Sequence, residues 1–198
     1  MLRTPAWSSS SAAGARRRRG TLPGKCASSH SSGIARWPIE STTSFGDAMT
    51  PTQELDAFIR RFTPEIAALT RKALVKMRKL TPGALELVYD NYNALAIGFC
   101  PTERAGDGIF SIAVYPRLVR VFFLQGKRLP DPTKRLQGSG SVVRSIPLES
   151  VHVLDEPDIR ALVDGALERA KIRLDPKQRR RTIIKSVSAK QRPRRPNA

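Results

Sequence analysis

The sequence predicts an α+β domain in which an N-terminal helical pair and a C-terminal helix pack on an antiparallel sheet of about five strands. Three observations lead to this prediction. Apolar residues recur at helical spacing over residues 55–80, and β-rich runs separated by turns fill residues 85–124. A second stretch of helical spacing covers residues 156–170. The predicted order is therefore two helices, five strands and one helix.

Helix start signals open this domain. Thr50 is a good capping residue, Pro51 suits the first helical position, and Gln53 can close a capping box. The start signal is repeated at Thr63, and the second helix places its basic residues outward and late, where they complement the negative end of the helix dipole. We interpret that basic cluster as a solvated face. The first helix carries one apolar stripe, formed by Leu55, Phe58, Ile59 and Phe62.

Five runs are predicted as strands because they are apolar and bounded by turn signals. They cover residues 85–90, 94–99, 109–115, 118–124 and 142–148. Pro147 places the last of them at an edge of the sheet, or at its own end, because proline cannot donate to a central ladder. The final helix begins near Glu156, where acidic residues suit a helix N-terminus. The first run has the alternation of a half-buried strand, with Leu85, Leu87 and Tyr89 set between Glu86, Val88 and Asp90.

The formal charge of +18 is unevenly distributed along the chain. Residues 1–48 carry a net +5 and residues 169–198 a net +11, which leaves only +2 for residues 49–168. We therefore divide the chain into a disordered lead (1–48), a domain (49–176) and a basic, largely flexible tail (177–198). The lead is interpreted either as a targeting-like segment or as residues that precede a true start at Met49.

The sequence predicts a cytoplasmic protein without a membrane segment. No apolar run approaches the roughly 20 residues that span a bilayer. Nothing after the basic run at residues 16–19 resembles the apolar core of a secretory signal. Cys26 and Cys100 lie in unrelated contexts, so no disulfide is expected and a reducing compartment is the simplest inference.

Six stretches of the chain resemble the YdhG-like family of small bacterial proteins, a domain of unknown function. They are LDAFIRRFTPEIAAL (55–69), ELVYDNYNALAIGF (86–99), SIAVYPRLVRVFFLQG (111–126), LPDP (129–132), LQGSG (136–140) and IKSVSAKQRPRRP (184–196). The resemblance implies an α+β fold with an antiparallel sheet covered by helices. Some relatives carry a frataxin-like iron-chaperone label. The family supplies no catalytic residues that could be transferred to this chain.

No catalytic residues, metal ligands or cofactor are predicted. The two histidines, His30 and His152, have neither metal-ligand spacing nor an evident catalytic partner, and we expect His152 to be an ordinary residue beyond the last strand. Iron held by carboxylates needs a clustered acidic surface. The best acidic group, at residues 155–158, is explained by the start of a helix. No nucleophile–base pair can be named, which favours a non-enzymatic protein.

The predicted ligand-binding site is the polar and aromatic bend formed by Tyr89, Asp90, Asn91, Tyr92 and Asn93. Two phenols, one carboxylate and two amides provide donors, acceptors and stacking faces within five residues. Tyr115 and Arg117 lie at another bend and reach the same end of the sheet if the strands form a simple antiparallel meander. A structural interpretation is the alternative: the polar side chains make local turn hydrogen bonds while the tyrosines cover the edge of the core.

Two weaker sites complete the predictions. Gly138, Ser139 and Gly140 could form a small anion nest beside Arg144, although a plain turn explains the same residues. The basic tail predicts weak, non-specific association with nucleic acid, with a solvated tail as the alternative. The leading hypothesis is a non-enzymatic binding module that recognises a small polar ligand or a protein partner at the 89–93 bend. Nucleic-acid association and frataxin-like iron binding are the alternative functions.

Overall fold

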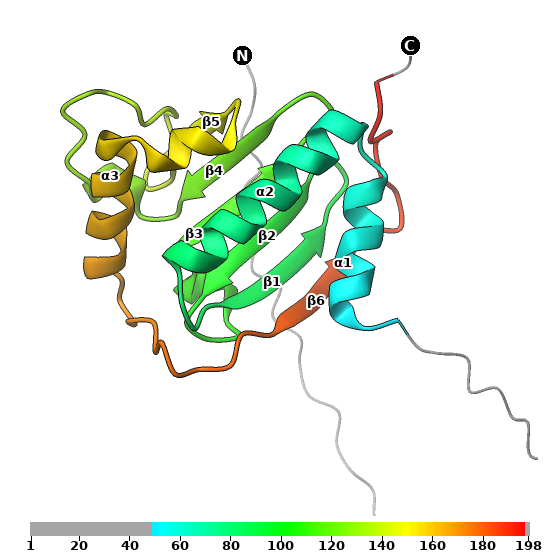
Figure 1. Cartoon of the computed structure of the whole chain (residues 1–198), viewed down its shortest axis with the longest axis horizontal. Coiled ribbons are helices and arrows are strands. Elements are labelled where there is room, and N and C mark those ends of the chain that lie inside the picture. Colours follow the sequence, from blue (N-terminus) through cyan, green and yellow to red (C-terminus); the bar gives the residue numbers. More distant parts are fainter. Residues whose placement is uncertain (1–48, 197–198) are drawn as a thin grey trace, which may run out of the picture. The chain divides into compact units, whose positions relative to one another are not determined.

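Two helices begin the part of the chain that the computed structural model describes, residues 49–196 (Figure 1). α1 covers Pro51–Arg60 and α2 covers Pro64–Leu80, as predicted. The predicted capping box is present at α1: the Thr50 hydroxyl accepts from the Gln53 N–H, and the Gln53 side chain accepts from the Thr50 N–H at 2.7 Å. The predicted lead, residues 1–48, lies outside the described residues.

The sheet has six strands in the described part of the chain, one more than predicted. Their spatial order is β5-β4-β3-β2-β1-β6, and β1 to β5 form an antiparallel meander. The α+β class is therefore confirmed, and Pro147 lies in an edge strand as predicted. The bounds of the strands are β1 Leu85–Asp90, β2 Leu95–Cys100, β3 Phe110–Val114, β4 Val119–Phe123, β5 Arg144–Leu148 and β6 Thr182–Val187.

β6 corrects the prediction of an all-antiparallel sheet and of a largely flexible tail. It lies beside β1 and runs parallel to it, with Ile183 opposite Leu87 and Ile184 opposite Val88 (Figure 1). A parallel neighbour needs a long crossover, which α3, Pro157–Glu168, and residues 169–181 provide. Gln178 anchors this crossover by donating a hydrogen bond to the backbone carbonyl of Gly83 at 2.8 Å.

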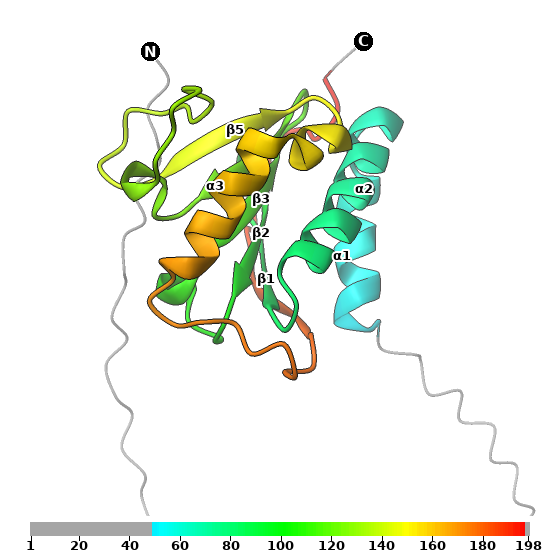
Figure 2. The ribbon, with the colours of Figure 1, turned by 60° about the vertical axis from the view of Figure 1, so that its left-hand side comes forward.

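α1, α2 and α3 cover the same face of the sheet (Figure 2). Their apolar side chains meet those of the strands in one core, in which the rings of Phe110 and Phe123 pack edge to face with centroids 5.4 Å apart. In the part of the chain that the structure describes, three short 3-10 helices lie in the connections, and the exposed His152 belongs to the last of them. They are η1 Ala105–Asp107, η2 Gly126–Arg128 and η3 Val151–Asp155.

None of the helices described in residues 49–196 is both long enough and apolar enough to cross a membrane.

Cys100 ends β2 on the opposite face of the sheet, where it packs against Leu85 and Leu87. The pKa of the Cys100 thiol is raised from 9.0 to about 11, mainly by burial and also by the nearby Asp107, while Lys185 acts in the opposite direction. The unfolded thiol ionises near 9.0, whereas the folded thiol stays protonated up to about 11. This group therefore lowers the stability of the fold as the pH rises above 9.0.

We expect the Cys100 thiol to resist alkylation in the folded protein. In a Cys26→Ser background, iodoacetamide at neutral pH should modify native Cys100 about a hundredfold more slowly than the denatured chain, because each unit of pKa lowers the thiolate population about tenfold. The rate should rise steeply as the pH approaches 11. Equal rates for the native and denatured protein at neutral pH would contradict the burial.

Candidate functional site

The strand register brings the two predicted bends to one end of the sheet. Asp90 pairs with Leu95, Leu95 with Val114, and Val114 with Val119. The β1–β2 bend and the β3–β4 turn, which contains Tyr115 and Arg117, therefore lie at the same end. The C-terminus of β6 reaches this end as well, because β6 runs parallel to β1.

The backbone of the β1–β2 bend is held by the segment that follows β6. Asn91 N–H donates to the Ala94 carbonyl at 3.0 Å and closes the bend. Ser188 N–H donates to the Asp90 carbonyl and Arg192 N–H to the Tyr92 carbonyl, both at 2.9 Å. The bend is thus fixed at both ends, while Tyr92 is 53% exposed.

Asp90 is a buried ionic centre and not an available ligand group. It is 1% exposed, and its carboxylate accepts from the Arg194 guanidinium at 2.6 Å, from Arg61 at 3.0 Å and from the Gln191 amide at 2.5 Å. These partners come from the helical pair and the C-terminal segment. The local turn bonds considered for Asp90 are therefore replaced by long-range ones, and the role of this side chain is structural.

Arg194 holds the C-terminal segment against the helices. Its guanidinium lies over the Phe62 ring, 5.5 Å from the centroid, and also donates to the Asn91 carbonyl. Its Nε and Nη1 atoms are buried and have no hydrogen-bond partner among residues 49–196. The charge of the Arg194 guanidinium is compensated by the Asp90 carboxylate. Arg195 adds a contact by donating to the Phe62 carbonyl at 3.2 Å.

Tyr89 and Tyr115 do not join Tyr92 on the exposed surface. Tyr89 is half-buried and packs against the Leu85, Leu87 and Cys100 cluster on the face of the sheet that the helices leave uncovered. Tyr115 is also half-buried, and burial raises the pKa of both phenols. Of the predicted bend, only Asn91, Tyr92 and Asn93 are exposed.

The exposed residues at this end carry positive charge. Arg117, Lys190 and Arg192 are exposed, and none of them forms an ion pair within residues 49–196. We group six of the exposed residues at this end under the name sheet-end surface. It consists of Asn91, Tyr92, Asn93, Arg117, Lys190 and Arg192.

At the weaker predicted anion site, residues 138–144, the arginine side chain is bonded to backbone carbonyls of its own loop. Arg144 donates to the Gly140 carbonyl at 2.5 Å and to the Val143 carbonyl at 2.8 Å, so its guanidinium faces loop oxygens. Gly138 has a φ of +124°, which explains glycine at that position. Ser139 lies between Gly138 and Gly140 in the same loop. Anion binding at this loop stays a prediction, and none of these contacts favours it.

A second buried carboxylate was missed by sequence analysis. Glu86 is 0% exposed and forms a bidentate pair with Arg78 of α2, at 2.6 and 2.9 Å, while the Thr182 hydroxyl donates to it at 2.9 Å. Glu86 and Asp90 sit at alternate positions of β1 with Val88 between them, so all three face the helices. The sequence does contain a signal for these buried ion pairs: Glu86 and Asp90 alternate with the apolar Val88, so both carboxylates lie on the same face of β1 as a core residue.

Comparisons with protein-family models, with curated proteins and with solved structures found no match to this chain. Within residues 49–196, no group of three or more His, Cys, Asp or Glu side chains is placed to hold a metal ion.

Proposed function

We propose that this domain is a non-enzymatic binding module that takes a small polar ligand with an anionic group at the sheet-end surface. The resemblance to the YdhG-like family is part of the proposal, because that family offers no catalytic residues to expect here. The protein partner that we considered beside a small ligand would use the same surface.

The exposed ring of Tyr92 is the observation that carries the proposal. Large aromatic side chains normally bury most of their surface, yet Tyr92 is 53% exposed on a bend whose backbone is fixed by Ser188 and Arg192. A ring in that position contributes little to the core of the domain. It is therefore available for stacking on a ligand, at little entropic cost because its backbone is already ordered.

The side chains around Tyr92 favour an anionic ligand. Arg192 lies next to Tyr92, because the Arg192 N–H donates a hydrogen bond to the Tyr92 carbonyl. Lys190 is two residues away in the same segment. Neither cation has a carboxylate partner in the described residues. Guanidinium and ammonium groups bind carboxylate and phosphate through charge-assisted hydrogen bonds, and the Asn91 and Asn93 amides add neutral donors and acceptors.

The two alternative functions have less support. Several cations of the basic tail already have partners: Arg194 is buried on Asp90, Arg195 donates to the Arg60 and Phe62 carbonyls, and Lys185 lies 3.6 Å from Glu103. Lys177, Arg179, Lys190 and Arg192 remain exposed without an ion pair within residues 49–196, and four cations support only weak contact with a phosphate backbone. No feature of the described residues carries the frataxin-like iron alternative.

A thermal-shift screen of phosphorylated and carboxylated metabolites tests this function. A binder should raise the melting temperature, because binding to the native state alone stabilises it by mass action. Tyr92→Ala should then weaken the binding of that compound by about tenfold or more, which corresponds to about 1.4 kcal/mol and is within the range of base or ring stacking. Arg192→Ala should weaken it comparably.

The controls separate a binding role from a structural one. Ile172→Ala and Lys177→Ala remove exposed side chains elsewhere and should leave binding unchanged. The free Tyr92→Ala protein should melt within about 2 °C of the wild type, since surface substitutions change stability by only about 0.5 kcal/mol. A clear loss of stability without any loss of ligand binding would assign Tyr92 to the fold and reject the proposal.

A further inference from the structure

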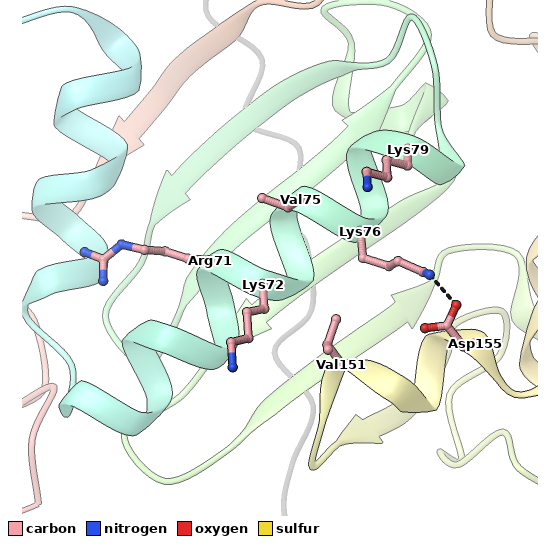
Figure 3. Close-up of a pocket in the computed structure, with 7 residues that line it drawn as sticks. All are labelled: Arg71, Lys72, Val75, Lys76, Lys79, Val151 and Asp155. Atoms are coloured by element: carbon pink, nitrogen blue, oxygen red, sulfur yellow. Dashed lines mark hydrogen bonds and ion pairs between the residues drawn. The ribbon is translucent and has the colours of Figure 1, made fainter.

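A shallow, basic hollow lies between α2 and η3, on residues that the sheet-end surface does not use (Figure 3). Its volume is about 380 Å³. Five lining residues come from α2 and two, Val151 and Asp155, from η3. We interpreted the basic face of α2 as a solvated face, and the structure places η3 next to it.

The hollow has an excess of positive charge. Four of its lining residues are cations and one is an acid. Arg71 is paired with Asp56 at 2.9 Å and Lys76 with Asp155 (Figure 3). The hydrogen bond from Lys76 holds the pKa of Asp155 below its usual value, so this acid is charged at neutral pH. Lys72 and Lys79 are exposed and have no carboxylate partner within residues 49–196.

Apolar surface lies between the two unpaired lysines. Val75 is 53% exposed, although it lies in a long helix with a well-defined buried face, and Val151 of η3 also lines the hollow. Lys72, Val75 and Lys79 are at positions i, i+3 and i+7, so they form one stripe along two turns of α2. The two lysine Cα atoms are then separated by about 10 Å along the helix axis.

We propose that this hollow binds an acidic amphipathic helix of a partner protein. A helix with carboxylates at positions i and i+7 and an apolar side chain at i+3 or i+4 has the matching spacing. Its carboxylates meet Lys72 and Lys79, and its apolar side chain covers Val75 and Val151. Nucleic acid fits less well, because no aromatic ring lines the hollow for stacking and its two uncharged lining residues, Val75 and Val151, are aliphatic.

The test uses the full chain and a labelled synthetic peptide of about 16 residues, long enough to populate a helix in isolation. The peptide carries Glu at i and i+7 and Leu at i+3 and i+4, with Ala and Gln elsewhere. Fluorescence anisotropy should detect saturable binding. Replacing both Glu residues of the peptide with Gln should weaken that binding by about tenfold or more, because both charge pairs are lost.

Variants of the protein locate the contact. Lys72→Glu combined with Lys79→Glu should weaken peptide binding by about tenfold or more, since the like charges then repel. Val75→Ala should weaken it about fivefold through lost apolar burial, without impairing the helix, because alanine is the better helix former. The charge-matched control combines Lys127→Glu with Lys177→Glu, two exposed lysines outside the hollow, and should bind as the wild type does.

Three results would overturn the proposal: no saturable binding of the peptide, equal losses in the Lys72/Lys79 variant and in its charge-matched control, or no effect of Val75→Ala. A single-stranded oligonucleotide serves as a parallel probe. If it binds more tightly than the peptide and loses affinity in the Lys72/Lys79 variant, the hollow is a nucleic-acid contact instead. Circular dichroism of each variant confirms that it is folded before its affinity is compared.

Discussion

Replacing Asp90 with alanine is expected to lower the free energy of unfolding by about 3–5 kcal/mol. Asp90 is 1% exposed, and the side chain of its partner Arg194 is 4% exposed. Removing the carboxylate leaves a guanidinium buried against Phe62 with no opposing charge. It also removes the acceptor that Arg61 and Gln191 share.

Chemical denaturation of the full chain, followed by circular dichroism, measures this loss as a lower midpoint at an unchanged slope. Glu103→Ala is a suitable control, because Glu103 also pairs with two cations, Arg181 and Lys185, but its side chain is 50% exposed. That change should lower stability by less than about 1 kcal/mol. Asp90→Ala combined with Arg194→Met should recover part of the loss, since the uncompensated charge is gone. An Asp90→Ala effect as small as that of Glu103→Ala would contradict the buried pair.

The Asp90 result also bears on the binding surface. Asp90 and Tyr92 were predicted as parts of one ligand site, but their environments differ. Asp90 is saturated by protein partners, whereas Tyr92 exposes half of its surface. Substitution of Asp90 should therefore affect folding first, and substitution of Tyr92 should affect binding without affecting folding. The contacts of Asp90 agree with the structural interpretation of the bend, and ligand binding at Tyr92 stays a proposal.

The helices and the meander could be predicted because their signals are local. Thr50, Pro51 and Gln53 define the start of α1 within four residues, and the capping box forms as the spacing requires. The β1–β2 and β3–β4 connections are short, so consecutive strands pair as neighbours. The common end of the two bends follows from that pairing alone.

β6 could not be predicted in the same way because its signal depends on a distant partner. Ile183 and Ile184 are set among seven basic residues of the 177–192 stretch, which favours a solvated tail by composition. What makes the stretch a strand is the edge of β1, whose Leu87 and Val88 lie about a hundred residues earlier in the chain. The carboxylates of Glu86 and Asp90 complete the match: Asp90 neutralises Arg194, and Glu86 accepts a hydrogen bond from the Thr182 hydroxyl.

Ending the chain at Asp175 is therefore expected to unfold the domain, although sequence analysis would have treated this truncation as harmless to the fold. The deletion removes β6 and exposes the hydrogen-bonding edge of β1. It also deprives Asp90 of Arg194 and Gln191, and Glu86 of the Thr182 hydroxyl. The combined loss should exceed about 5 kcal/mol, which is comparable to the whole stability of many domains. A cooperative thermal transition should be absent.

Two further end points show which contacts matter. A chain that ends at Ala189 keeps β6 and the Ser188 bond to Asp90 but loses Gln191 and Arg194, so it should fold with a stability close to that of Asp90→Ala. A chain that ends at Pro196 keeps every described residue and should match the full chain. If the chain that ends at Asp175 still melted cooperatively near the full-length temperature, β6 would be dispensable. The basic C-terminal segment would then be free for the anionic partners that its composition first indicated, because Arg194 would no longer be needed to hold Asp90.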